Sequence, residues 1–168
     1  MKSKLIIIRG NSGAGKTTVA KALQRGLGHG TLLVSQDVVR REMMFVKDGR
    51  DNPAIDLMRQ IAGYGNGKSE YVIVEGITAE KWYNDMFKEL IDDFDGRYFA
   101  YYFDIPFEET VRRHNTKPNS HEFGETEMKR WWNEKDFLNL DKEKVITKEY
   151  DFSTVMNVIL SDINYERE

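Results

Sequence analysis

The most constraining feature of the chain is an eight-residue run near its N-terminus, Gly10-Asn11-Ser12-Gly13-Ala14-Gly15-Lys16-Thr17. Its spacing matches the phosphate-binding pattern G-x-x-x-x-G-K-[ST] at every fixed position. The glycines permit backbone conformations with positive φ, which turn successive N–H groups inward and form a concave anion site. Apolar residues 5–8 precede the run, and a helical pattern begins at Lys16. The run therefore predicts a phosphate-binding loop between a buried strand and the N-terminus of a helix.

We expect this loop to hold the triphosphate of ATP together with Mg²⁺. Lys16 would place a positive charge beside the β- and γ-phosphates, and the Thr17 hydroxyl would be a ligand of the metal. The other residues expected to contact the nucleotide are Gly10, Asn11, Ser12, Gly13, Ala14, Gly15 and Thr18.

Length and composition limit the remaining possibilities. The 168 residues fit one domain, 1–168, and the net charge of −3 gives no sign of a basic surface for duplex nucleic acid. The chain has no cysteine, which excludes disulfides and thiolate zinc sites and is compatible with the cytoplasm, the location we expect. The apolar run at residues 5–8 is too short for a signal peptide, and no stretch approaches the roughly 20 apolar residues of a membrane span.

Strand and helix patterns alternate along the chain, which is typical of an α/β sheet with crossover helices. The expected strands are residues 5–8, 31–34, 71–74, 98–103 and 145–147. The expected helices are residues 16–25, 36–45, 53–62, 79–94, 107–113, 125–137 and 154–163. The aromatic-rich strand at residues 98–103 is expected to lie in the core.

Asp37 and Arg40 follow the second expected strand, where an open parallel sheet binds its ligands. Their spacing of three places them on one face of the helix expected there. Asp37 could accept the proton of a substrate hydroxyl that attacks the γ-phosphate, and Arg40 could hold an anionic part of the same substrate. The alternative is a surface ion pair, with Asp37 favouring the helix dipole.

Glu75 ends the third expected strand, where phosphate-loop proteins often place an acid that holds Mg²⁺. We take Glu75, with Thr17, as the candidate metal ligand. Two alternatives remain at this position: a contact with substrate, or a cap on the turn at residues 76–78.

Three arginines lie around a polar loop at residues 116–124 that contains Pro, Gly, Asn and Ser. This loop is a candidate for a moving segment, within a lid insertion at about residues 114–130. One of Arg112, Arg113 and Arg130 is expected to act on the transferring phosphoryl group.

The histidines and tryptophans of the same region carry weaker signals. His114 and His121 lack metal-ligand spacing, so we expect them to be exposed or packed in loops. Trp131 and Trp132 are expected to pack in the fold, with stacking on a base as the alternative.

Together, the phosphate loop, the Asp37-x-x-Arg40 pair, Glu75 and the arginine-led lid resemble the P-loop kinase group. That group includes polynucleotide 5′-kinases, gluconate-type kinases, antibiotic phosphotransferases and nucleoside monophosphate kinases. The resemblance implies a three-layer fold with a five-stranded parallel sheet, the first strand central, a helical lid over ATP, and adenine beside residues 148–153. The Asp-x-x-Arg pair is most similar to that of the polynucleotide kinases, where the Asp is the base and the Arg binds a phosphate of the acceptor. The stretch 116–130 holds one arginine, fewer than in typical monophosphate kinases.

The expected function is therefore an ATP-dependent transfer of the γ-phosphoryl group to a hydroxyl of a nucleoside, a polynucleotide end or a small molecule. A P-loop ATPase without an acceptor, or a nucleotide-binding regulator, is the alternative. A GTPase is disfavoured because residues 115–118 do not match the guanine-reading motif Asn-Lys-x-Asp. A dinucleotide enzyme is disfavoured because residues 13–18 lack the last glycine of the motif G-x-G-x-x-G.

Overall fold

A computed structural model describes residues 1–164 and has a five-stranded parallel sheet at its centre. The sheet order is β2-β3-β1-β4-β5, so the first strand is central. The strands are β1 (Lys4–Gly10), β2 (Leu32–Ser35), β3 (Tyr71–Gly76), β4 (Tyr98–Asp104) and β5 (Glu143–Thr147). All five predicted strands are confirmed, each with its ends moved by at most a few residues.

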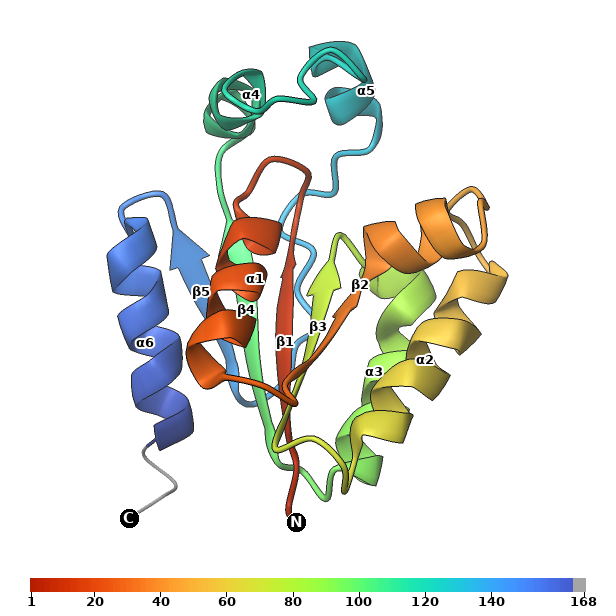
Figure 1. Ribbon diagram of the computed structural model, residues 1–168. Coiled ribbons are helices and arrows are strands. Elements are labelled where there is room, and N and C mark those ends of the chain that lie inside the picture. Colours follow the sequence, from red (N-terminus) through yellow and green to blue (C-terminus); the bar gives the residue numbers. More distant parts are fainter. Residues whose placement is uncertain (165–168) are drawn as a thin grey trace.

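Helices cover both faces of the sheet, which makes three layers (Figure 1). One face carries α1 (Lys16–Leu27) and α6 (Phe152–Asn164), and the other carries α2 (Pro53–Gly65) and α3 (Glu80–Asp93). Alternate residues of β1 point to opposite sides: Leu5 and Ile7 join the α2 and α3 core, whereas Ile6 and Ile8 join the core under α1 and α6. Because both faces are covered, residues 5–8 of the strand are all apolar.

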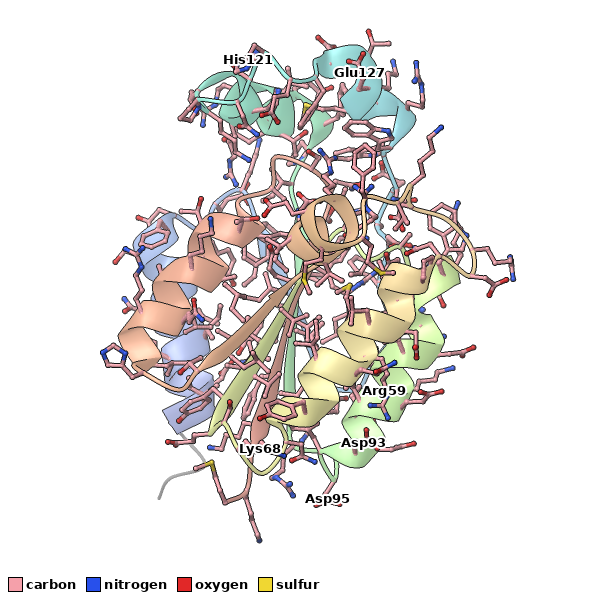
Figure 2. The ribbon with its side chains drawn as sticks, turned by 45° about the vertical axis from the view of Figure 1, so that its right-hand side comes forward. Arg59, Lys68, Asp93, Asp95, His121 and Glu127 are labelled. Carbon is pink, nitrogen blue, oxygen red and sulfur yellow. The ribbon has the colours of Figure 1, made fainter. Side chains whose placement is uncertain are left out.

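Two short helices stand beyond the carboxyl ends of the strands, over the phosphate loop (Figure 1). They are α4 (Phe107–Asn115) and α5 (Glu125–Arg130), and we call residues 107–131 the lid. Figure 2 shows His121 and Glu127 of the lid at one end of the molecule and Lys68 at the other. Within residues 1–164 no helix has the length and apolar character needed to cross a membrane.

The helix expected at residues 36–45 takes an unusual form. Gln36 and Asp37 are helical, and the chain then continues as a π-helical turn, η1 (Val38–Met43). In a π-helix the backbone bonds join residues five apart, so each turn is wider than in an α-helix, and such turns are frequent at functional sites.

The prediction of one helix over residues 125–137 is wrong, because α5 ends at Arg130. The side chain of Asn11 accepts a hydrogen bond from Asn133 N at 2.8 Å and donates one to Asn133 O at 2.6 Å. These bonds occupy the backbone groups that a continuing helix would use, and Lys135 then takes a positive φ of 42°. The segment after the lid is thereby tied to the phosphate loop.

Arg9, which is 1% exposed, fixes the same segment from inside the molecule. Its Nη2 lies 2.7 Å from Asp136 Oδ2 and donates a hydrogen bond to Thr78 O, while Nη1 lies 3.6 Å from Glu143 Oε1. Burial lowers the pKa of Arg9, and the two carboxylates oppose that shift. Arg9 is thus the centre of a buried network that joins β1 to the turn after β3, to the segment before β5 and to the first residue of β5.

Replacing Arg9 with methionine should lower the free energy of unfolding by about 3–5 kcal/mol, because it leaves carboxylates without their buried partner. Urea denaturation measures the change. Lys144→Met is the matched control: its ion pair with Asp162 is exposed on the lysine side, and its loss should cost no more than about 1 kcal/mol. Equal costs for the two variants would contradict a stabilising network.

Candidate active site

The phosphate loop has the backbone geometry that an anion site requires. Gly13 and Gly15 have φ values of +79° and +95°, a region that side chains disfavour. A Cβ atom on Gly13 would lie 2.5 Å from Thr110 O, so α4 of the lid packs directly on the loop. Glycine at position 13 therefore serves both the turn and the close approach of the lid.

Lys16 begins α1 and is almost completely buried. Its Nζ donates a hydrogen bond to Asn11 O at 2.8 Å. Desolvation lowers the pKa of Lys16 to about 8, and the charges of Glu75 and Asp37 oppose the shift. A phosphate group beside Nζ would favour the charged form and raise this pKa again.

Binding of Mg·ATP should therefore weaken as the pH rises through about 8, because the nucleotide needs the protonated form of Lys16 and the free protein loses it there. Between pH 7 and pH 9 we expect the apparent Kd to increase by about tenfold, with proton uptake on binding at pH 8. Calorimetry in buffers of different ionisation enthalpy measures both. Lys16→Arg should remove the dependence, since arginine stays charged, and an identical slope in that variant would assign the titration to another group.

Thr17 and Glu75 face each other where α1 begins and β3 ends. Thr17 Oγ1 lies 3.2 and 3.3 Å from the two carboxylate oxygens of Glu75, and Ser35 Oγ donates to Glu75 Oε1 at 2.7 Å. Glu75 is only 3% exposed. Among residues 1–164 no group of three or more His, Cys, Asp or Glu side chains could hold a metal. A buried carboxylate beside a hydroxyl fits Mg²⁺ that takes its remaining ligands from phosphates and water.

Two cavities meet at the phosphate loop. The η1 cavity, of about 440 Å³, lies between the loop, η1 and the lid, and Thr17, Asp37 and Glu75 are in its wall. The α6 cavity, of about 490 Å³, lies between the loop, α4 and the β5–α6 connection. Three residues line both cavities: Gly13, Thr18 and Lys117. The arrangement provides one space on each side of the phosphate-binding residues.

The wall of the α6 cavity includes residues 146–152. The segment that the resemblance associates with adenine, residues 148–153, therefore borders a space next to the loop. Phe103 and Ile105 at the end of β4 add apolar surface to this wall.

Asp37 forms ion pairs with Arg40 and Arg41, but the two arginines lie in different surroundings. Asp37 lines the η1 cavity and is 61% exposed, whereas Arg40 is only 14% exposed, donates from Nη1 to Val46 O at 3.2 Å, and has a buried Nε without a hydrogen-bond partner. Arg41, and not Arg40, lies in the wall of the cavity, and its Nε is 3.5 Å from Asp37 Oδ1. Asp37 and Arg40 lie together as their spacing of three predicts, although Arg40 is not in the wall of the η1 cavity.

The three arginines around the lid lie in different surroundings. Arg113 donates from Nη1 to Ala14 O of the phosphate loop at 3.0 Å and also pairs with Glu109. Arg112 is 68% exposed and forms a two-bonded pair with Glu109, whose pKa falls to about 2 mainly through that hydrogen bond. Arg130 is exposed and borders neither cavity. Of the three, only Arg113 forms a hydrogen bond to the phosphate loop in the described chain, while Arg112 and Arg113 both border the α6 cavity.

Lys117 is a residue that sequence reasoning missed. It lies in the loop between α4 and α5, borders both cavities, and its charge contributes to the lowered pKa of Lys16. The sequence placed Lys117 in the polar loop at residues 116–124, but the sequence of a loop does not indicate which of its side chains points toward the phosphate site.

The structure also shows the surroundings of the two histidines and two tryptophans of this region. His114 is buried, stacks on Phe123 and bonds to Phe123 O at 2.7 Å, which confirms loop packing, while His121 is exposed. Trp132 packs edge-on against Phe107. Trp131 packs edge-on against Phe123 and borders the η1 cavity.

The strand order, the phosphate loop and the opposed Thr17 and Glu75 side chains place the molecule among P-loop nucleotide-binding folds. Residues 5–136, more than half of the chain, match the family model described as an AAA domain, and the chain belongs to this family. No curated protein matches the chain.

Solved structures of similar fold include three kinases. The APS kinase of Mycobacterium tuberculosis, in complex with AMPPNP and APS, is 14% identical with a TM-score of 0.71, over 97% of this chain and 98% of that one. A gluconokinase from Sinorhizobium meliloti 1021 is 13% identical with a TM-score of 0.62, over 99% and 98%. Shikimate kinase from Acinetobacter baumannii, in complex with shikimate, is 16% identical with a TM-score of 0.57, over 97% and 92%. The predicted fold and the resemblance to the P-loop kinase group are confirmed.

Proposed function

We propose that the protein is an ATP-dependent kinase that transfers the γ-phosphoryl group to a hydroxyl of a small molecule. The observation that carries the proposal is the pair of cavities that meet at the phosphate loop. A regulator or a simple ATPase needs space for the nucleotide alone, whereas a kinase needs a second space for the acceptor next to the γ-phosphate.

In this proposal the nucleoside occupies the α6 cavity, and the triphosphate runs along residues 10–18 toward the η1 cavity. Lys16 would bind the phosphates, and Thr17 and Glu75, which lie side by side in the wall of the η1 cavity, would hold Mg²⁺. The metal, when bound, would neutralise charge on the phosphates during transfer.

Asp37 is the proposed general base. Its side chain lines the η1 cavity. Within the described chain its partners are Arg40 at 3.7 Å and Arg41 at 3.5 Å, and both are ion pairs longer than a close hydrogen bond. As the acceptor oxygen bonds to the γ-phosphorus, the bond to ADP breaks and the hydroxyl proton passes to the Asp37 carboxylate. The products are ADP and a phosphate ester.

The lid supplies the remaining positive charge. Arg113 contacts the phosphate loop, and Lys117 borders both cavities, so these two residues are proposed to stabilise the charge on the transferring group. Residues 116–124 would close over the substrates and exclude water, which would otherwise consume ATP. The lid and the sheet act here as one domain, residues 1–168.

Small molecules are favoured over nucleic-acid ends as acceptors. The three similar kinases are, by their names, an APS kinase, a gluconokinase and a shikimate kinase. The η1 cavity, at about 440 Å³, is also of a size typical of small-molecule sites.

The test is a panel of hydroxyl compounds in an assay of ADP formation from Mg·ATP. The proposal requires ADP formation that depends on at least one acceptor. ADP formed at the same rate without any acceptor would indicate an ATPase, and nucleotide binding without turnover across the panel would indicate a regulator.

A further inference from the structure

The side-chain amide of Gln36, the residue before Asp37, is buried and hydrogen-bonded at each of its polar groups. Its Nε2 donates to Tyr83 Oη at 2.8 Å and to Asp48 Oδ2 at 3.1 Å. Its Oε1 accepts a hydrogen bond from Thr78 N at 3.1 Å. The three partners belong to α3, to the loop after η1 and to the turn after β3. One side chain therefore joins the turn that carries Asp37 to three other segments.

The surroundings of this amide fix its orientation. The N–H of Thr78 requires an acceptor, and the carboxylate of Asp48 requires a donor, so a reversed amide or a carboxylate at position 36 would lose both bonds. Burial raises the pKa of Tyr83 to about 12, so its hydroxyl keeps the proton and donates to Asp48 Oδ1 at 2.8 Å. Each donor of the group thus faces an acceptor, which rigidifies a buried polar network.

The network holds both ends of η1. Gln36 precedes the π-helical turn, Asp48 follows it, and the Tyr83 hydroxyl contacts both. Asp48 Oδ1 also accepts a bond from Asn52 Nδ2 at 3.0 Å, and Asn52 is the N-cap of α2. A phenol on α3 is therefore the common anchor of η1 and of the loop that leads to α2.

The bond to Thr78 joins η1 to the opposite wall of the η1 cavity. Thr78 is fully buried with a positive φ of 40°, a conformation that persists only where the surroundings hold it. A Cβ atom on Gly76 would lie 2.5 Å from Gln36 Cβ, so the glutamine packs directly on this turn. Gly76 borders the cavity next to Glu75. Gln36 thereby sets the spacing between the wall with Asp37 and the wall with Glu75.

From these contacts we infer that Gln36 is a positioning residue for phosphoryl transfer and that Tyr83 orients it. The inference rests on the proposed kinase function with Asp37 as its base. Asp37, and not Gln36, lies in the wall of the η1 cavity within the described chain, so Gln36 acts through Asp37. The acceptor hydroxyl must face Asp37 and the γ-phosphate at once, and a displacement of about 1 Å can cost roughly 10²-fold in rate.

Tyr83→Phe tests the inference, and Tyr101→Phe is its matched control. Both phenols are buried and donate to a carboxylate, but Tyr101 bonds to Asp162 of α6 at 2.7 Å, on the other face of the sheet. Urea denaturation should show similar losses of stability in the two variants. We expect the kcat of acceptor-dependent ADP formation to fall about tenfold in Tyr83→Phe only, with the KM for ATP unchanged. Gln36→Met, which removes all three bonds, should lower kcat further.

The background of Asp37→Asn separates positioning from a general loss of structure. The phenylalanine variants are repeated in this background, with single-turnover rates as the measurement. If Tyr83 acts through Asp37, the tenfold effect of Tyr83→Phe should shrink to within about twofold once the carboxylate is absent. A merely structural effect would lower the rate by the same factor in both backgrounds.

Hydrogen exchange provides a readout that does not depend on turnover. With Mg·AMPPNP bound, the backbone amides of residues 38–46 should exchange about tenfold faster in Tyr83→Phe than in the wild type. They should exchange at the wild-type rate in Tyr101→Phe.

Equal kcat in Tyr83→Phe and Tyr101→Phe would overturn the inference, as would an undiminished effect in the Asp37→Asn background or unchanged exchange of residues 38–46. The kinase proposal is tested separately by the wild-type protein. Acceptor-dependent turnover in the wild type with normal kcat in Tyr83→Phe would preserve the kinase and reject the positioning role. Faster exchange in Tyr83→Phe without any acceptor-dependent turnover in the wild type would reject the kinase and support the anchoring of η1.

Discussion

Replacing Lys16 with alanine is expected to reduce acceptor-dependent ADP formation by at least about 10³-fold and to weaken Mg·ATP binding sharply. The buried ammonium lies 2.8 Å from Asn11 O and is the one side-chain cation of residues 10–17, so we propose that it is the charge of the loop that binds the phosphates. The fold should survive, because burial disfavours the charge of Lys16, as its lowered pKa indicates. Calorimetry and the ADP assay measure the two effects.

Lys68→Ala is the control for this experiment. Lys68 lies at the opposite end of the molecule from the lid (Figure 2), where its ammonium stands over the Tyr64 ring. Its removal should change neither affinity nor rate. Wild-type affinity and activity in Lys16→Ala would show that the loop does not bind the nucleotide.

Replacing Asp37 with asparagine is expected to lower the acceptor-dependent rate by roughly 10²- to 10⁴-fold, with little change in ATP affinity. The amide keeps the size of the side chain but cannot accept the hydroxyl proton. Steady-state kinetics with a saturating acceptor separate kcat from KM.

Glu42→Gln is the matched control, because Glu42 lies on the same helical turn and also borders the η1 cavity. It should keep kcat within a few-fold of wild type. If Asp37→Asn retained normal kinetics and lost only thermal stability, Asp37 would be a member of a structural ion pair with Arg41.

The sheet could be predicted from the sequence because its signals are local. Residues 5–8 are apolar without interruption, and this is what a strand covered on both faces requires. The phosphate loop could be predicted for a similar reason, since its glycines, Lys16 and Thr17 are adjacent in the chain.

The end of α5 could not be predicted because contacts distant in sequence decide it. Residues 131–137 have a composition compatible with a helix, but Asn11 pairs with the backbone of Asn133, and Arg9 pairs with Asp136. Neither partner is visible from the segment itself.

The place of Arg41 in the cavity wall could not be predicted from the spacing of the charged residues. Counting by three on an α-helix selects Arg40 as the partner of Asp37, and the two residues do pair, but the count does not reveal that Arg41 also pairs with Asp37 and lies in the wall of the η1 cavity. Lys117 was missed for a related reason, because the fold of a loop over the phosphate site determines which of its side chains points inward.

The most direct test of the proposed function is to follow the label of γ-³²P-ATP in a single turnover with an acceptor that supports ADP formation. If the η1 cavity holds the acceptor beside the γ-phosphate, the label appears in a phosphate ester of the acceptor hydroxyl, and Asp37→Asn slows its appearance. Release of all the label as inorganic phosphate, with the acceptor unlabelled, would contradict a kinase and show that the cavity admits water as the nucleophile.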